Sequence, residues 1–587
     1  MIVVSPIRSH SLPVGDIPTQ VFRSAEPYRD EVVLIDAESE RQFTIGDIIT
    51  TSTKLAAGLT RQGFGGRVIS VFDNTQLQLV YVYYAAMMAG GAFQSLDTNV
   101  AESNLRDQIA FTQTPAIFTS HSYLHKLLDA TKGLDVSIYV FDHSCTPNGA
   151  AALVCTAEGI RSRSSSSGSS TINCTCSDSA VSGCCAPISN LLIEDPTFVP
   201  VRITSKDDAM RKPAYLAFLP DSYEPAAPAV RRQRPLMLSH YSLLSSQRLT
   251  RPPRLLDAHR TVVSAVPFSG AHGVNTVTHF PMLSGSRVIQ LSKSTPSMCL
   301  STVEKWRAGV FFANYLVLAS IDATATRVNG RIVVGSESFD ASSLQVIFVH
   351  EIRVPQSFKE RIKALFQARL VELYGYIETG IIAGVIAEHP RIDDSVGLLC
   401  PNVKARVMID GSEVGEDEYG EIHVSTPRLA SVEVGDLNGD DRFFCTGDYG
   451  KVTANGVVII KGRMNDLIYM EGGRIVAPTD IEKELLENPG VADCAAFSVP
   501  ADRHGDDVGD GGGGGGGSES NSQLPFVYVV PVAAENTQID MDNVLQPLAR
   551  LYPGIRVSII DHIPKCDKGE PRRSLLREIA TKDIDSS

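Results

Sequence analysis

The sequence predicts an α/β protein with a large N-terminal domain of layered α/β subdomains, a β-rich subdomain and a small α+β C-terminal domain. Three observations support this prediction. Short apolar runs alternate with stretches of helical length over the first two thirds of the chain, the runs become shorter and richer in turn residues from about residue 403, and both kinds recur near the end. Continuous apolar strands separated by helices are typical of mainly parallel sheets with helices on both faces.

The individual elements follow in order along the chain. Runs rich in β-branched and aromatic residues predict the strands of the layered part, at residues 67–72, 116–119, 137–142, 261–266, 309–312 and 344–349. Apolar content of helical length predicts helices at residues 77–90 and 355–368. Shorter runs predict the strands of the β-rich subdomain, at residues 405–409, 421–424 and 456–460.

Two stretches of unusual composition are predicted not to fold. Residues 145–203 form a Ser- and Cys-rich stretch whose centre, residues 161–183, is dominated by serine, and residues 507–523 include seven consecutive glycines. Such compositions bury too little apolar surface to offset the entropy lost on ordering. We therefore predict a disordered insertion in the large domain and a flexible loop in the small one.

Six of the 11 cysteines lie in the predicted insertion. Four of these lie close together in the sequence and suggest either a zinc site or thiols in a disordered loop: Cys174, Cys176, Cys184 and Cys185. Their spacing is not a usual zinc spacing, and the nearest histidine, His143, lies well upstream. This favours the second interpretation. A disulfide framework is expected in small secreted domains and not in a chain of this length.

The chain carries 53 basic and 67 acidic side chains, a formal net charge of −14. Nucleic acids and anionic membranes reward clustered lysine and arginine, so neither is expected as the main partner. The longest apolar run, residues 80–93, is shorter than the ~18 residues of a membrane span. Because the sequence has no signal-peptide pattern and no C-terminal peroxisomal tripeptide, we expect a cytoplasmic protein.

A series of short motifs extends nearly from one end of the chain to the other. In order, the motifs are residues 63–74, 89–93, 266–273, 374–378, 420–422, 446–448, 462–463, 478–482 and 563–565. Each string is weak alone, but together and in this order they resemble the adenylate-forming (AMP-binding) acyl- and aryl-CoA ligases, most closely the 4-coumarate–CoA ligase branch. The resemblance implies the fold of that family, with a mobile C-terminal domain.

The resemblance also implies domain limits and an activity. The domains would be residues 1–462 and 463–587, with a hinge near Asn465. The activity would be that of an ATP-dependent, AMP-forming ligase, in which an aryl or fatty carboxylic acid attacks Mg²⁺-bound ATP and coenzyme A then accepts the acyl group as a thioester. Because both reactants of the first step are anions, the site must supply cations and hydrogen-bond donors and exclude water.

On this resemblance the nucleotide is bound by five residues. Asp448 matches the carboxylate that binds the ribose hydroxyls, and Arg463 matches the arginine that completes this clamp. Tyr374 and Gly375 match the segment beside adenine, and Glu378 matches the glutamate that binds Mg²⁺. The alternatives are a solvated turn residue for Asp448, strand-end packing for Tyr374 and a surface charge for Glu378.

The acyl pocket is represented by two candidates, His272 and Gly273, in the loop that resembles the pocket of the family. His272 is offset from the position of the family's histidine, so a packing or loop role is the alternative. His240 follows Ser239 where the family has a Thr-His pair, and we expect it to be structural.

Three departures from the family's pattern affect nucleotide handling. Residues 214–225 stand where the family has a Ser/Thr/Gly-rich phosphate loop, but they include no glycine or lysine, and Asp221 and Glu224 add negative charge. Residues 349–353 are bulky where small residues would let the backbone approach adenine. Ile377 replaces a threonine whose hydroxyl could contact the α-phosphate.

The fourth departure concerns the catalytic lysine, whose position holds Glu570. Lys568 lies two residues earlier and, in an extended segment, would point to the same face about 7 Å away, so it could replace the lost cation. The arginines within residues 231–234 could instead bind phosphates with their side chains. A solvated basic loop is the alternative for these arginines, and we favour it.

These departures leave three interpretations of function. The first is an acid–CoA ligase with a divergent site. The second is a catalytically inactive pseudoenzyme that retains a nucleotide or acyl pocket for binding or regulation. The third is a decaying gene product, which the Ser- and Gly-rich insertions also fit. The phosphate loop and the lysine act in the same half-reaction, and both are altered. Loss of selection for catalysis would produce such a joint change, which favours the pseudoenzyme. The ligase class still best describes the ancestry of the chain.

Overall fold

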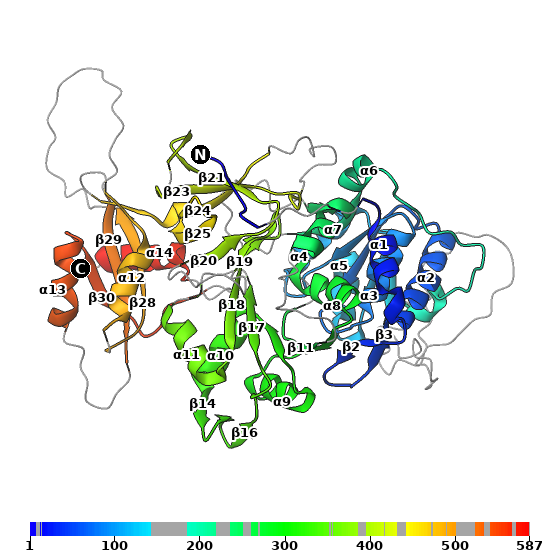
Figure 1. Ribbon diagram of the computed structural model, residues 1–587, viewed down its shortest axis with the longest axis horizontal. Coiled ribbons are helices and arrows are strands. Elements are labelled where there is room, and N and C mark those ends of the chain that lie inside the picture. Colours follow the sequence, from blue (N-terminus) through cyan, green and yellow to red (C-terminus); the bar gives the residue numbers. More distant parts are fainter. Residues whose placement is uncertain are drawn as a thin grey trace. The chain divides into compact units, whose positions relative to one another are not determined.

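A computed structural model describes most of the chain (Figure 1). The described residues are 1–7, 12, 14–141, 185–218, 235–249, 260–267, 271–350, 354, 356–384, 395–415, 417–430, 442–470, 474–488, 490–500, 523–532, 541–565 and 571–585. Contacts divide the chain into two compact units. The large unit comprises Val4–Lys404 and Val424–Phe444, and the small unit comprises Met1–Val3, Ala405–His423 and Cys445–Ser587. The predicted domain limits and hinge describe a movement of the C-terminal domain, which a single structure does not test, so they stay predictions.

The first sheet of the large unit has seven strands. Across the sheet they are β10 (Leu236–Ser239), β9 (Pro213–Ala217), β5 (Ala92–Ser95), β4 (Val68–Phe72), β6 (Ala116–Thr119), β7 (Ser137–Val140) and β8 (Ala186–Pro187). Neighbours are parallel except β9 and β10. All four residues of β5 and of β6 are buried, as expected for parallel strands covered on both faces.

The second sheet of the large unit is also mainly parallel. Its strands are, in order, β20 (Ser395–Leu399), β19 (Gly380–Gly384), β18 (Arg369–Tyr376), β17 (Val346–His350), β13 (Val310–Ala313), β11 (Thr261–Ser264), β12 (Arg287–Gln290), β2 (Val32–Asp36) and β3 (Gln42–Thr44). The pairs from β18 to β2 are parallel, and the strands beyond them are antiparallel. A separate antiparallel sheet contains β14 (Ala325–Val328), β15 (Arg331–Val334) and β16 (Glu337–Phe339).

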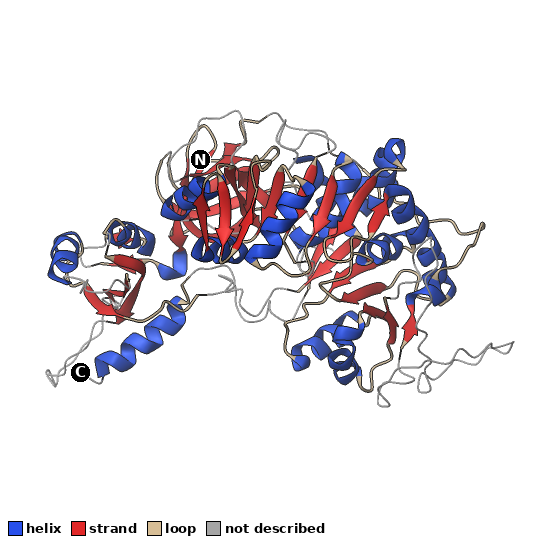
Figure 2. Cartoon of the chain, turned by 90° about the horizontal axis from the view of Figure 1, so that it is seen from below, coloured by secondary structure: helices blue, strands red, loops and turns tan. Residues whose placement is uncertain are grey.

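Helices pack against both sheets (Figure 2). They are α1 (Ile17–Ala25), α2 (Ile45–Arg61), α3 (Leu79–Met88), α4 (Glu102–Thr112), α5 (His121–Thr131), α6 (Lys206–Arg211), α7 (His240–Leu249), α8 (Ala271–Ser284), α9 (Pro296–Trp306), α10 (Tyr315–Thr324) and α11 (Gln356–Phe366), with short 3-10 turns η1 (Glu26–Tyr28) and η3 (Ile188–Leu191). Every residue of α3 is buried, which is typical of a helix that is apolar all round. Its core cluster includes Phe93 and Phe118 of the first sheet and Phe348 of the second, so the two sheets share one core.

Local sequence explains where α2 begins. The hydroxyl of Thr44 accepts from the amide of Asp47 at 3.0 Å, and the carboxylate of Asp47 accepts from the amide of Thr44 at 3.1 Å. This reciprocal capping box satisfies donors that a helix start leaves without partners.

The small unit combines a strand group with an α+β part. The strands are β21 (Lys404–Ile409), β23 (Gly420–Ser425), β24 (Phe444–Val452) and β25 (Val457–Arg463), hydrogen-bonded in that order, with the two-residue strands β1 (Val3–Val4), β22 (Ser412–Glu413), β26 (Ile468–Tyr469) and β27 (Ile475–Val476). The α+β part has the sheet β28 (Val491–Pro500), β29 (Gln523–Pro531) and β30 (Arg556–Ile559), with helices α12 (Pro478–Leu486), α13 (Met541–Leu551) and α14 (Arg573–Asp585). Separate core clusters place α12 and α13 on one face of this sheet and α14 on the other.

The predicted elements are confirmed. The strands expected at residues 67–72, 116–119 and 344–349 are β4, β6 and β17, and the helices expected at residues 77–90 and 355–368 are α3 and α11. The remaining predicted strands are β7, β11, β13, β21, β23 and β25. The α/β architecture therefore follows from local apolar patterns.

The predicted insertion is wrong at its C-terminal limit. Its residues up to 184 lie outside the described residues, but residues 185–203 are ordered and include β8 and η3. Ile188 and Leu191 are almost completely buried, because they add to the core beside α2. Serine-rich composition ends before these apolar residues begin. The predicted loop at residues 507–523 lies outside the described residues except for its last residue, which begins β29.

Replacing Gly58 with alanine tests the packing of residues 185–203. A Cβ atom on Gly58, in α2, would stand 2.0 Å from the carbonyl oxygen of Leu191. Overpacking costs about 1–3 kcal/mol, against a gain in helix propensity of about 1 kcal/mol. We expect a lower free energy of unfolding in a urea titration. Gly309→Ala is the matched control, since no atom lies within 4 Å of its Cβ; equal stability of the two variants would contradict this packing.

Candidate functional site

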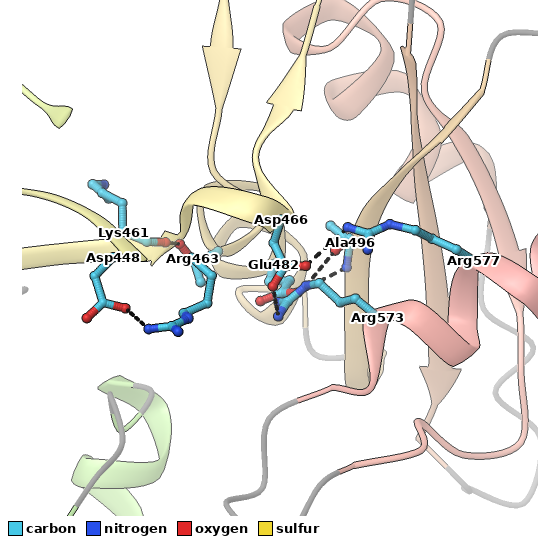
Figure 3. A network of polar contacts seen from close by, with 9 residues as sticks. Asp448, Lys461, Arg463, Asp466, Glu482, Ala496, Arg573 and Arg577 are labelled. Carbon is cyan, nitrogen blue, oxygen red and sulfur yellow. Dashed lines mark hydrogen bonds and ion pairs between the residues drawn. The ribbon is translucent and has the colours of Figure 1, made fainter. Parts of the chain in front are cut away.

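Asp448 and Arg463 form an ion pair in the small unit (Figure 3). They stand opposite one another in the antiparallel pair of β24 and β25. Nη1 of Arg463 donates to Oδ1 of Asp448 at 2.8 Å and to the carbonyl of Thr446 at 3.0 Å. The side chain of Asp448 is 5% exposed and that of Arg463 is 25% exposed. This burial excludes a solvated turn residue as the description of Asp448.

The backbone around Asp448 is held by its own motif. Gly447 has φ = 70°, a conformation that favours glycine. The hydroxyl of Thr446 donates to the carbonyl of Ile422 at 2.6 Å and accepts from the amide of Asp448 at 3.1 Å. The threonine and glycine therefore fix the direction of the carboxylate. A carboxylate of fixed direction is suited to accept hydrogen bonds from a ligand with two neighbouring hydroxyls.

A second polar network surrounds the predicted hinge. Asn465 lies in the 3-10 turn η5 (Met464–Asp466). Asp466 accepts from Arg577 at 3.1 Å and lies 3.6 Å from Arg573, and Arg573 also donates to Glu482 at 2.6 Å (Figure 3). These pairs fasten η5 to α14 and α12.

The motif at residues 478–482 forms the start of α12. Pro478 occupies the first turn, where a missing amide hydrogen costs nothing. Asp480 pairs with Lys461 at 2.6 Å, and the hydroxyl of Thr479 donates to the carbonyl of Lys461. This motif therefore ties α12 to β25, next to Arg463.

Tyr374, Gly375 and Glu378 lie in the large unit, at the end of β18 and in the turn that follows. The ladder between β18 and β19 shifts register between Tyr374 and Gly375, and a Cβ on Gly375 would stand 2.1 Å from the carbonyl oxygen of Gly380, so glycine is required. Glu378 is 6% exposed, and its carbonyl accepts from the amide of Ala430 at 2.6 Å. A surface charge is therefore wrong as a description of Glu378.

The turn after β18 contains the position of the missing threonine. Ile377 packs against the core of the large unit. The buried hydroxyl of Thr379 accepts from the amide of Tyr376 at 3.2 Å and donates to the carbonyl of Gly380 at 2.9 Å. Because Thr379 is used inside the turn, it does not replace the hydroxyl lost at Ile377.

His240 has the structural role expected of it. It is 3% exposed, and its Nδ1 accepts from the amide of Ile17 at 3.2 Å, at the first residue of α1. Burial lowers the pKa of His240 to about 4, so the imidazole is neutral near pH 7 and can accept this hydrogen bond.

The structure corrects one acyl-pocket prediction. His272 and Gly273 belong to the first turn of α8, which begins at Ala271, and not to a loop. Gly273 is buried, and the side chain of His272 lies outside the described residues.

Several predicted residues also lie outside the described residues. They are Lys568, Glu570, the candidate zinc cysteines Cys174, Cys176 and Cys184, the arginines of residues 231–234 and most of the phosphate-loop stretch. The ends of the segment that holds Lys568 and Glu570 are described: Lys565 and Pro571 form an antiparallel bridge, and the amide of Arg572 donates to the carbonyl of Pro564 at 2.8 Å.

One residue near Asp448 was assigned no role from the sequence. A carboxylate oxygen of Glu421 accepts from the amide of Gly447 at 3.1 Å, so Glu421 supports the part of β24 that directs Asp448. Glu421 belongs to the motif at residues 420–422, so this motif could have pointed to a role for Glu421 in the sequence. Over the part of the chain that the structure describes, no helix is both long and apolar enough to cross a membrane.

Solved structures that share this fold include the following three. ATP-bound MatB from Rhodopseudomonas palustris has a TM-score of 0.72 and 18% identity, over 96% of this chain and 99% of that one. The anthranilate CoA ligase AuaEII in complex with anthranoyl-AMP has a TM-score of 0.72 and 14% identity, over 98% of this chain and 99% of that one. A benzoate CoA ligase from Burkholderia xenovorans LB400 has a TM-score of 0.70 and 15% identity, over 96% of this chain and 99% of that one. These likenesses show the fold of the adenylate-forming ligases, a large α/β domain with a small C-terminal one, and so confirm the predicted fold class.

The sequence profile described as AMP-binding enzyme matches residues 21–159 and 234–432, more than half of the chain. The chain belongs to the AMP-binding enzyme family, which confirms the resemblance drawn from the motifs.

Similar proteins include ligases from fungi, amoebae and plants. Acyl-CoA ligase cm3C of Cordyceps militaris is 25% identical over 374 residues, 60% of this chain and 55% of that protein. Probable 4-coumarate–CoA ligase 1 of Dictyostelium discoideum is 28% identical over 277 residues, 45% of this chain and 48% of that protein. The chain thus spans about half the length of these two relatives. The 4-coumarate–CoA ligase of Pinus taeda is 21% identical over 578 residues, 95% and 93%.

Proposed function

We propose that the protein is an ATP-dependent, AMP-forming acid–CoA ligase that activates an aryl or fatty carboxylic acid, at a low rate set by its altered phosphate-handling residues. The observation that carries the proposal is the ion pair of Asp448 and Arg463, whose Oδ1 and Nη1 atoms lie 2.8 Å apart between the paired strands β24 and β25. A carboxylate fixed by a guanidinium is suited to accept hydrogen bonds from the two hydroxyls of a ribose.

The other nucleotide-binding residues have complementary roles in the proposal. Tyr374 and Gly375 would lie beside adenine, where the glycine allows close backbone approach. Glu378 would hold the Mg²⁺ of the ATP complex, because a buried carboxylate is the hard oxygen donor that Mg²⁺ prefers. An ion held there would supply positive charge against the phosphates, which would let the acid, itself an anion, approach the α-phosphorus and displace pyrophosphate.

A thiol, for which coenzyme A is proposed, would then attack the acyl carbon of the acyl-adenylate, forming the thioester and releasing AMP. Residues 463–587 would turn about Asn465 between the two half-reactions. The pairs of Asp466 with Arg573 and Arg577 support this part of the proposal, since they make α14 follow any rotation of η5.

The experiment that tests the function measures pyrophosphate release from Mg·ATP by the purified full-length chain. The panel contains hydroxycinnamic acids, benzoic acids and medium- to long-chain fatty acids. We expect turnover with one class of acid, formation of its CoA thioester, and binding of ATP in calorimetry. ATP binding without pyrophosphate release from any acid would contradict the ligase, and absence of both would contradict any nucleotide function.

A second candidate is a nucleotide-binding protein that does not turn over. Two observations favour it: Glu570 stands at the position of the family's lysine, and the hydroxyl of Thr379 is engaged within its own turn and does not replace the one lost at Ile377. Calorimetry together with the pyrophosphate assay distinguishes this candidate from the ligase.

Lys568→Ala tests whether a displaced cation supports the remaining rate. A unit charge ~4 Å from a phosphate at an effective dielectric of ~20 contributes about 4 kcal/mol, which corresponds to about three orders of magnitude in rate. We expect pyrophosphate release to fall by up to this factor. Lys582→Ala, in the exposed part of α14, is the matched control and should keep the wild-type rate. Equal rates in both variants would remove Lys568 from the mechanism.

A further inference from the structure

Three different metal-ligating side chains converge in the small unit. Glu421 and His423 belong to β23, and Cys445 belongs to β24. One donor atom from each lies within 4.8 Å of the other two, and this is the single such group among the residues that the structure describes. Sγ of Cys445 lies 3.8 Å from Nδ1 of His423, and Nε2 of His423 lies 3.1 Å from a carboxylate oxygen of Glu421.

The strand geometry explains why these side chains meet. Glu421 and His423 are two residues apart on one strand, so they point to the same face. Cys445 comes from β24, the neighbour of β23 in the sheet. The other oxygen of Glu421 accepts from the amide of Gly447, which holds the carboxylate in place. The carboxylate is therefore held beside Nε2 of His423, while Cys445 lies beside Nδ1 of the same ring.

We propose that Glu421, His423 and Cys445 bind a divalent metal ion of the zinc class. A thiolate, an imidazole and a carboxylate are the donors that zinc takes in proteins, whereas Mg²⁺ and Ca²⁺ prefer oxygen alone. Bonds of about 2.3 Å to sulfur and about 2.0 Å to nitrogen at a tetrahedral angle would separate the two donors by roughly 3.5 Å. The sulfur–nitrogen distance of 3.8 Å is close to this value for an ion on Nδ1 of His423. Because Glu421 meets the other ring nitrogen, Nε2, the carboxylate or the imidazole must turn for one ion to reach all three residues.

The burial of the three residues indicates how accessible the site is to solvent. His423 is 9% exposed and the side chain of Glu421 is 25% exposed, while Cys445 is exposed. Three protein donors leave a fourth tetrahedral position, which water would fill. The exposed thiol gives an ion a path from solvent, so we infer a site that exchanges its metal with the surroundings. Binding converts the thiol to a thiolate and releases its proton to solvent.

This site does not depend on the proposed ligase activity. Its ion differs in chemistry from the Mg²⁺ that accompanies ATP. It also differs from the candidate cluster of Cys174, Cys176, Cys184 and Cys185, which belongs to another part of the sequence. Of these four, the structure describes Cys185, which is buried.

The test uses zinc alone with the full-length chain. Because other cysteines could also take up zinc, the reference protein has Cys174, Cys176 and Cys184 replaced by serine. Zinc affinity and stoichiometry are measured by competition with a chromophoric chelator. We expect one zinc per chain in the reference protein, and at least a tenfold loss of affinity on adding Cys445→Ser or His423→Asn. Glu418→Gln, an exposed carboxylate on the same segment, is the matched control and should keep the reference affinity.

A second readout detects the thiolate ligand directly. Co²⁺ bound by the reference protein should show the charge-transfer absorption of a thiolate ligand, and adding Cys445→Ser should abolish it. Cys445→Ser changes one atom of an exposed residue, so its circular dichroism should match the reference. Absence of the thiolate band, or zinc affinity unchanged by Cys445→Ser, would overturn the proposal.

Discussion

Replacing Glu570 with lysine is expected to raise the rate of pyrophosphate release from Mg·ATP by at least a hundredfold. The substitution reverses the charge at the position where the family has its catalytic lysine. A unit charge ~4 Å away contributes about 4 kcal/mol at an effective dielectric of ~20, so a reversal is worth at most about 8 kcal/mol. This bound corresponds to roughly six orders of magnitude in rate, and solvent and nearby lysines reduce it.

The measurement compares initial rates of pyrophosphate release with the acid that the wild type accepts best, or with the full panel if it accepts none. Glu570→Gln removes the negative charge without adding a positive one, so its rate should lie between those of the wild type and Glu570→Lys. Glu578→Lys makes the same change of charge on the exposed side of α14 and should leave the rate unaltered. If Glu570→Lys binds ATP yet gains no rate, the limiting defect lies in the phosphate-loop stretch.

Asp448→Asn is expected to weaken the binding of Mg·ATP by at least a hundredfold. Asparagine keeps the size of the side chain but removes the charge that neutralises Arg463 and that, in the proposed function, accepts the ribose hydroxyls. A hydrogen bond to a charged group contributes about 1.5–3 kcal/mol, so loss of two such bonds corresponds to roughly two to four orders of magnitude in affinity. Isothermal titration calorimetry with ATP measures this change.

Two controls make the result specific to the ribose. Asp480→Asn breaks a different acid–base pair of the small unit, the one with Lys461, and should leave ATP affinity close to that of the wild type. The wild type should bind 2′-deoxy-ATP less tightly than ATP, whereas Asp448→Asn should bind the two equally. A preference for ATP that survives in Asp448→Asn would show that Asp448 does not contact the ribose.

Much of the fold could be predicted because the signals are local. The run at residues 116–119 is apolar at every position, and the run at residues 77–90 is apolar over a helical length, so each specifies its element within a few residues. Asp448 and Arg463 were found in a similar way, through short strings of fixed spacing. Their ion pair could not be derived from those strings, since it depends on the register of β24 and β25.

By itself the sequence determined the α/β class, the order of the elements, the family and the residues to which a nucleotide role is proposed. Only the tertiary structure decided that residues 185–203 pack against α2, that Thr379 is engaged within its own turn, and that Cys445 meets His423 and Glu421. The physical reason is the range of the interactions. Strand and helix preferences act between neighbours in the chain, whereas burial, register and the meeting of side chains more than twenty residues apart are set by the packing of the whole domain.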